Sequence, residues 1–228
     1  MSQIPVIAID GPSGAGKGTI CRRIATKLGW HLLDSGALYR LVALDALNTG
    51  LSLEEEAQVA KLARDLDTEF LPGSKGVQVM LRGVDASEQI RAEACSRGAS
   101  VVAAMPEVRA RLIDRQRDFR QMPGLVADGR DMGSVVFPDA ALKIFLTASV
   151  EERALRRYKQ LKDKGIDVSL SALSRDMADR DRRDAERPVA PLKACADARV
   201  LDSTALTIDE VVARVLEWVA EVYPVNRV

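Results

Sequence analysis

The residues best suited to chemistry lie in a glycine-rich stretch near the N-terminus. The segment from Gly11 to Thr19 reads GPSGAGKGT and follows the apolar run VIAID. The pattern G-x-x-x-x-G-K fits from Gly11 to Lys17. Between a strand and a helix, such a loop offers backbone N–H groups and a mobile lysine to phosphate oxygens. We therefore predict a nucleotide-phosphate site rather than a tight turn alone, made by Gly11, Pro12, Ser13, Gly14, Ala15, Gly16, Lys17, Gly18 and Thr19.

One position departs from the common phosphate-loop pattern. A Ser or Thr that contacts Mg²⁺ usually follows the lysine, but Gly18 stands there and the hydroxyl comes at Thr19. One residue corresponds to a rotation of about 100° around a helix. We therefore expect Mg²⁺ to be held largely through water, with no metal site made by the protein alone. Asp128, at the end of a predicted strand, is a candidate for orienting magnesium-bound water.

A second set of candidates consists of arginines near the ends of predicted strands. Arg40 in LLDSGALYR and Arg130 in DGRDMG each follow an apolar strand, and ligands of open α/β sheets bind at that edge. A phosphate acceptor needs charge neutralisation, which arginine supplies, whereas a hydroxyl acceptor needs a base. Most single arginines are only solvated surface charges. The positions of these two favour an acceptor that itself carries a phosphate.

Short apolar strands and amphipathic helices alternate along most of the chain and must position these side chains. We predict parallel strands at 6–9, 30–34, 125–131, 141–149 and 198–204, joined by helices. This pattern is typical of a doubly wound α/β sheet. Three helix starts are predicted from capping boxes, and Pro106 is placed in the first turn of a helix that carries Val108, Leu112 and Phe119 inward. The capping boxes pair Ser52 with Glu55, Ser149 with Glu152, and Thr207 with Glu210.

The pattern changes in the segment 67–87, DTEFLPGSKGVQVMLRGVDAS. Val77, Val79 and Leu81 alternate strictly with polar or exposed positions, which predicts a small antiparallel sheet with one solvated face. A later segment, 153–187, holds eight arginines among many acids.

Composition excludes several classes of protein. The 33 basic residues balance 33 acidic ones and aromatics are only 4%, so neither nucleic acid nor a membrane surface is an expected partner. Cys21, Cys95 and Cys195 are odd in number and lack a C-x-x-C pair, which indicates a reducing cytoplasm without disulfides or zinc. The lone His31 is expected to be packed or partly exposed rather than catalytic. No apolar run is long enough for a membrane span.

Four stretches resemble bacterial cytidylate kinases, within the P-loop nucleoside monophosphate kinase family, and the resemblance covers nearly the whole chain: IDGPSGAGKGT, LLDSGALYR, DGRDMGSVVFPDA and RDRRDAERPVAPL. It implies an α/β fold of the P-loop NTPase type, a five-stranded parallel sheet flanked by helices. The core would comprise 1–34, 98–150 and 188–228. Residues 35–97 would bind the monophosphate and hold the antiparallel insert at about 67–86, and 151–187 would form a short helical lid. The implied activity is transfer of the γ-phosphoryl group of ATP to CMP or dCMP by a monomeric cytoplasmic enzyme.

The resemblance also implies roles for single residues. Lys17, Arg130, Arg180 and Arg187 would be catalytic, and Arg157 would contact ATP. A carboxylate suits the N4 amino donor of cytosine, so Asp131 would read the base unless it only pairs with Arg130 or caps a turn. The CMP-binding residues would be Ser35, Tyr39, Arg40, Ser100, Arg109, Arg130, Asp131, Arg180, Asp184 and Arg187.

Two other hypotheses stay open from the residues alone. The chain could be a small-metabolite kinase of the shikimate or gluconate type with Asp34 as base, or a nucleotide-binding switch that transfers nothing. The arginines of the acceptor region count against both, because neither needs several arginines around a second anion.

Overall fold

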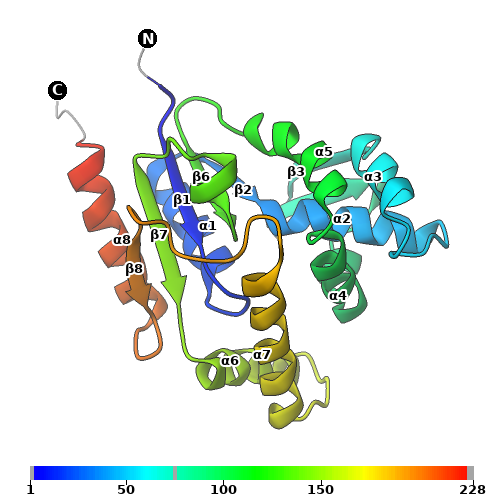
Figure 1. Ribbon diagram of the computed structural model, residues 1–228. Coiled ribbons are helices and arrows are strands. Elements are labelled where there is room, and N and C mark those ends of the chain that lie inside the picture. The colour runs from blue at the N-terminus through cyan, green and yellow to red at the C-terminus, as the bar shows by residue number, and fades with distance from the viewer. Residues whose placement is uncertain (1–2, 74–75, 225–228) are drawn as a thin grey trace. The chain divides into compact units, whose positions relative to one another are not determined.

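The computed structural model describes residues 3–73 and 76–224 (Figure 1). Its chain forms two compact units, Met1–Leu33 with Arg117–Val228, and Asp34–Gln116. Residues 98–116, which the division by resemblance assigns to the core, belong to the second unit. The parts of the predicted regions at 1–2, 74–75 and 225–228 lie outside the described residues.

The first unit holds a five-stranded sheet with the order β2-β6-β1-β7-β8. β1 is parallel to both β6 and β7, and β7 is parallel to β8. The predicted parallel α/β sheet is therefore confirmed. Its elements are β1 (Val6–Asp10), α1 (Lys17–Leu28), β2 (His31–Asp34), β6 (Leu125–Gly129), the π-helical turn η2 (Met132–Val136), β7 (Leu142–Thr147), α6 (Val150–Asp163), α7 (Leu170–Glu186), β8 (Arg199–Asp202) and α8 (Ile208–Val222).

One face of this sheet is buried by α1 and α8. Ile7 and Ile9 of β1 and Ile144 of β7 pack in one apolar cluster with Ile24 of α1 and Val215 of α8. Every residue of β1 and β6 is buried, as expected for central strands of a parallel sheet. Burial on this scale fixes the strand ends, and with them the loops that leave the sheet after β1 and β6.

After β7 the chain forms a pair of packed helices, α6 and α7 (Figure 1). Ser149 is the N-cap of α6, and its side chain accepts a hydrogen bond from the backbone N–H of Glu152. These helices coincide with the arginine-rich segment. Among the described residues no helix is both long enough and apolar enough to span a membrane.

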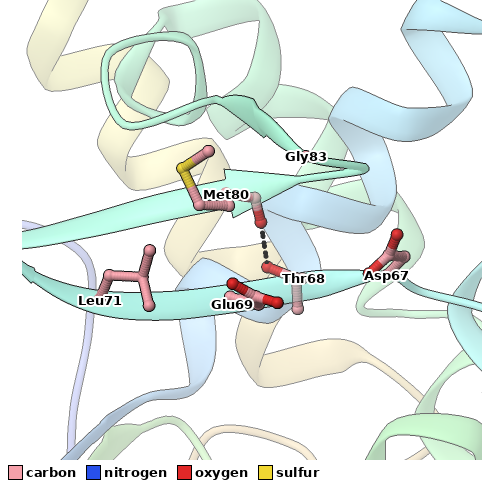
Figure 2. A pocket seen from close by; sticks show the side chains of 6 residues that line it. All are labelled: Asp67, Thr68, Glu69, Leu71, Met80 and Gly83. Carbon is pink, nitrogen blue, oxygen red and sulfur yellow. Dashed lines mark hydrogen bonds between the residues drawn. The ribbon is translucent and has the colours of Figure 1, made fainter.

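The second unit consists of helices and a small antiparallel sheet with the order β3-β4-β5. This sheet confirms the insert predicted at about 67–86. A pocket on it is lined by Asp67, Thr68, Glu69, Leu71, Met80 and Gly83 (Figure 2). None of these six is a predicted site residue. The elements are α2 (Ser35–Asn48), α3 (Glu56–Arg64), β3 (Thr68–Gly73), β4 (Gly76–Leu81), β5 (Val84–Asp85), the 3₁₀ turn η1 (Gln89–Arg91), α4 (Glu93–Val102) and α5 (Pro106–Arg117).

A bidentate ion pair attaches the insert to α2. Arg82, in the turn after β4, donates to both carboxylate oxygens of Asp45 at 2.8 and 2.7 Å. Asp45 is buried with 1% exposure. Because removing one partner of a buried charge is costly, this pair holds the hairpin in a defined place on α2.

Three local predictions were wrong. Ser52 and Glu55 do not form a capping box: α3 begins at Glu56 without a side-chain cap, because the N–H of Glu55 closes a turn onto the carbonyl of Ser52. Phe119 lies beyond the end of α5. Val77 is 49% exposed although Val79 and Leu81 on the same strand are buried, since it lies near the hairpin end of β4.

Candidate functional site

The loop Gly11–Thr19, here called the phosphate loop, joins β1 to α1. A side chain at Gly11 would place its Cβ 2.0 Å from the carbonyl oxygen of Leu146 on β7, so only glycine fits there. Gly16, with φ of 92°, is the N-cap of α1 and offers no capping side chain. The loop can therefore turn its backbone N–H groups and the positive end of the helix dipole to an anion.

Lys17 is buried at the start of this helix. Its Nζ donates to the carbonyl oxygen of Pro12 at 2.9 Å and lies 3.9 Å from Oδ1 of Asp128. Burial, together with the nearby positive charge of Arg130, lowers the pKa of Lys17 from 10.5 to about 8. Lys17 is thus a desolvated cation held by the loop itself, as expected for a residue that contacts phosphate.

Asp128 is the carboxylate that faces the phosphate loop from β6. A Cβ at Gly18 would lie 3.5 Å from Oδ2 of Asp128, so this carboxylate faces the place where common phosphate loops carry a hydroxyl. Among the described residues no group of three or more His, Cys, Asp or Glu side chains could hold a metal by itself. Asp128 therefore offers one carboxylate oxygen donor at this place, of the kind that Mg²⁺ prefers.

Four charged residues form a second feature, here called the acid–arginine cluster: Arg130, Asp131, Asp184 and Arg187. Two consecutive residues after β6 pair with two residues near the end of α7. Nε of Arg130 donates to Oδ2 of Asp184 at 3.0 Å, and Nη2 of Arg187 lies 3.7 Å from Oδ1 of Asp131. All but Arg130 are buried. The structure thus brings together four predicted site residues that are up to 57 positions apart in the sequence, counted from Arg130 to Arg187.

The alternatives to base recognition for Asp131 are a salt bridge to Arg130 or a turn cap. Asp131 forms an ion pair with Arg187, and it is the N-cap residue of η2 without a side-chain capping hydrogen bond.

Two charged residues near the phosphate loop were missed by the sequence reasoning. Asp10, at the end of β1, accepts hydrogen bonds from the backbone N–H groups of Met132 and Gly133. Burial raises its pKa to about 6, although these two hydrogen bonds act in the opposite direction. An acid that ends an apolar strand just before a glycine loop was the signal that could have found it.

Arg153 of α6 is the second residue missed, and it connects three elements. It is 2% exposed. Its guanidinium donates to the carbonyl of Ala148, to the carbonyl of Ser13 in the phosphate loop, and to both carboxylate oxygens of Asp181 on α7. The sequence shows it only as one of eight arginines, with no local sign of burial.

We expect Arg153→Lys to lower kcat/KM for the nucleotide bound by the phosphate loop by about 10- to 100-fold. A lysine keeps the charge but cannot reach three acceptors at once, and hydrogen bonds of charged groups contribute about 1.5–3 kcal/mol. Steady-state kinetics checks this, with Arg175→Lys on the exposed side of α7 as the matched control. A lower melting temperature with unchanged kinetics would mean that Arg153 only supports the fold.

Three further arginines lie on α6 and α7: Arg156, Arg157 and Arg180. Nη1 of Arg156 lies 4.0 Å from where a Cβ of Gly16 would be, and its Nη2 donates to the carbonyl of Ser203 at 2.6 Å. Arg157 and Arg180 are both half-buried.

The second unit carries its own group of predicted site residues. The guanidinium of Arg109 lies 6.0 Å from the ring centre of Tyr39, and both residues are buried. Oγ of Ser100 is a buried hydroxyl for which the described residues offer no hydrogen-bond partner. Ser35 is the buried first residue of α2. The unsatisfied buried hydroxyl of Ser100 is a group that a polar ligand could satisfy.

Arg40 and Asp34 interact at the start of α2. Asp34 is the N-cap of this helix: Oδ1 accepts from the N–H of Ala37 at 3.0 Å, and Oδ2 accepts from Nη2 of Arg40 at 2.8 Å. Nε of Arg40 is buried and has no hydrogen-bond partner among the described residues. Both oxygens of Asp34 therefore have structural partners, which does not favour the hypothesis that it is a catalytic base.

Comparisons with known proteins agree with this site. Residues 7–221 match the family model described as cytidylate kinase. The chain is 59% identical over 214 residues to a cytidylate kinase of Aeromonas salmonicida, covering 94% of this chain and 93% of the relative. It is 57% identical over 222 residues to one of Pseudomonas putida, covering 96% and 97%. A solved structure of an uncharacterized protein from Eubacterium ventriosum shares the fold, with a TM-score of 0.52, 11% identity, and coverage of 96% and 99%. With its phosphate loop, its acid–arginine cluster and these relatives, the chain belongs to the cytidylate kinase family.

Proposed function

We propose that the protein transfers the γ-phosphoryl group of ATP to CMP or dCMP, giving CDP or dCDP. The observation that carries this proposal is the acid–arginine cluster: Arg130 is close enough to Lys17 to lower its pKa, so an anion could be held near the phosphate loop. An acceptor that is already an anion needs such arginines and no base.

Each group of residues has a proposed role toward the acceptor. In the first unit, Arg130 and Arg187 bind its phosphate, Arg180 and Asp184 its sugar, and Asp131 the N4 amino group of cytosine. In the second unit, Ser35, Tyr39 and Arg40 bind the phosphate side, and Ser100 and Arg109 bind the base. The unsatisfied hydroxyl of Ser100 and the buried guanidinium of Arg109 support roles toward the acceptors N3 and O2 of cytosine.

The mechanism is in-line transfer by positioning and charge stabilisation, without a protein base or a covalent intermediate. The phosphate loop binds the donor phosphates through its backbone N–H groups. Lys17 exchanges its hydrogen bond to Pro12 for one to the transferred phosphoryl group. Arg157 contacts ATP, and the helices α6 and α7, as a lid over the donor, keep water from the reacting phosphate.

Asp128 would orient the water shell of the Mg²⁺ that accompanies ATP. The structural support is the carboxylate of Asp128, which faces Gly18. The cation supplies neutralisation of the donor phosphates. We further propose a monomer that works in the cytoplasm, where its three cysteines stay reduced. The proposed core, acceptor-binding region and lid have boundaries at residues 35, 98, 151 and 188, of which the boundary at 98 lies inside the second compact unit, Asp34–Gln116.

A screen of acceptors tests this function. Coupled ADP release is measured with ATP against CMP, dCMP, UMP, AMP, shikimate and gluconate. We expect CMP and dCMP to be the preferred acceptors. Preference for a hydroxylated metabolite would favour a kinase with Asp34 as base, and tight ATP binding without any turnover would favour a nucleotide switch.

Asp131→Asn tests the proposed reading of the base. An amide can offer NH₂ to the carbonyl that uracil carries where cytosine has its amino group, so the preference for CMP over UMP should narrow by about 5- to 150-fold, or 1–3 kcal/mol. The ratio of kcat/KM values for the two acceptors measures this. An unchanged ratio would make Asp131 only a structural partner of Arg187.

A further inference from the structure

The carboxylate of Asp10 makes contacts that its sequence position does not predict. Asp10 ends β1, one residue before the phosphate loop. Its Oδ1 nevertheless accepts from the N–H of Met132 at 2.8 Å, and its Oδ2 accepts from the N–H of Gly133 at 2.9 Å. These two residues follow Arg130 and Asp131 directly. Asp10 is therefore next to the phosphate loop in sequence, but its side chain accepts hydrogen bonds from the loop that follows Arg130 and Asp131.

The surroundings of Asp10 make this contact a rigid one. Asp10 is 6% exposed, and hydrogen bonds to a charged acceptor are roughly twice as strong as neutral ones. A Cβ on Gly133 would lie 3.1 Å from Cδ of Lys143 and 3.5 Å from Oδ2 of Asp10. The space that a side chain at Gly133 would need is thus already taken by Lys143 and Asp10.

These two hydrogen bonds also fix the residues directly before Met132 and Gly133, which are Arg130 and Asp131. Two bonds to consecutive amides set both the position and the direction of the backbone at Met132 and Gly133. A shift there would move Arg130 away from Asp184, at 3.0 Å, and Asp131 away from Arg187, at 3.7 Å. The cluster therefore depends on a carboxylate that no acceptor needs to touch.

We propose that Asp10 is a positioning residue for the phosphoryl acceptor, which acts by fixing the backbone that carries Arg130 and Asp131. This inference rests on the acceptor roles proposed for those two residues. It predicts a selective defect: loss of the Asp10 carboxylate weakens the use of CMP and leaves the binding of ATP nearly unchanged, although Gly11 of the phosphate loop is its neighbour in the chain.

Asp10→Asn is the main test, because it keeps the size of the side chain. Its amide oxygen can accept from one N–H, but its NH₂ group would face the other, so one of the two bonds is lost. We expect KM for CMP to rise about tenfold or more, the CMP-over-UMP preference to narrow, and KM for ATP to change less than about twofold. Asp209→Asn is the matched control, since Asp209 is an exposed acid paired with Arg23 on the surface.

A second variant and a binding measurement distinguish a selective defect with CMP from an effect on the phosphate loop or on folding. Asp10→Ser should show the same selective defect, and calorimetric titration of each variant with ATP alone should give the wild-type Kd. A rise in KM for ATP as large as that for CMP would overturn the inference, because Asp10 would then act on the phosphate loop. Failure of both variants to fold would also overturn it, since Asp10 would then only support the fold.

The proposed function can fail separately from this inference. Asp131→Ala and Arg130→Met are measured beside Asp10→Asn. If both leave the use of CMP unchanged, their proposed acceptor roles are wrong and the inference falls with them. If both impair CMP and Asp10→Asn does not, the acceptor roles stand and the positioning role of Asp10 is overturned.

Discussion

Lys17→Ala should reduce kcat by at least about 100-fold, equivalent to about 2.7 kcal/mol of barrier, while the protein stays folded. The reason is that Lys17 is a buried cation whose Nζ donates to the carbonyl of Pro12 in the loop itself, so its removal takes away the positive charge at the donor phosphate. Steady-state turnover with saturating ATP and CMP measures the effect. Lys27→Ala, at the exposed end of the same helix, is the matched control. A loss below tenfold would mean that Lys17 does not contact the transition state.

The stability of this variant should follow from the pKa of Lys17. In the unfolded chain its pKa is 10.5 and in the folded protein about 8, so the unfolded chain binds the proton more tightly. The charged lysine therefore costs stability at neutral pH, on the order of 3 kcal/mol. This cost disappears as pH rises from about 8 to 10.5. Thermal melting should find Lys17→Ala no less stable than the wild type at pH 7, with any advantage shrinking toward pH 10.

Arg130→Met should lower kcat/KM for CMP by about 100- to 1,000-fold, or about 2.7–4 kcal/mol. The substitution removes the positive charge that, in our proposal, binds the acceptor phosphate, whereas ATP is held mainly by the phosphate loop. KM for ATP should therefore stay within about twofold. Arg130→Lys should recover little, because an ammonium group cannot make the bidentate contact. A parallel rise in both KM values would place Arg130 outside the acceptor site.

A second variant separates this loss from damage to the fold. Removing Arg130 leaves Asp184, which is 7% exposed, without the partner at 3.0 Å, and a buried charge that loses its partner is strongly destabilising. The double variant Arg130→Met/Asp184→Asn removes that charge while keeping the shape. We expect it to regain thermal stability and to remain slow with CMP, because it lacks Arg130 and also the carboxylate of Asp184 that we propose binds the sugar. Recovery of activity together with stability would show that Arg130 has a structural role only.

The phosphate loop could be predicted from the sequence because its chemistry is local. Gly11, Gly16 and Lys17 lie within seven consecutive residues. The contacts that call for these residue types lie within the same stretch or, for Gly11, with the neighbouring strand β7. The strands could be predicted too, since apolar runs of four to six residues between helical segments favour a parallel sheet. Four short stretches resemble cytidylate kinases and so predicted the family, which the comparisons confirm.

Helix starts show that a local sequence pattern is not always sufficient to predict the local structure. Thr207 with Glu210 and Ser52 with Glu55 have the same spacing and residue classes. The first pair forms both hydrogen bonds of a capping box, whereas the second does not, because Ser52 takes part in a turn and α3 starts one residue after Glu55. A cap contributes only about 1 kcal/mol, so the path of the chain before α3 can override it.

The sequence by itself therefore determined the phosphate loop, the parallel sheet, the antiparallel insert and the family. The tertiary structure alone decided which charges meet. Asp10 bonds to amides 122 and 123 residues away, and Arg153 bonds to Ser13 across 140 residues. A buried carboxylate or guanidinium must find partners, but which partners it finds depends on how the β1, β6 and α7 ends converge. No spacing along the chain encodes that convergence, since it is set by burial of the whole sheet.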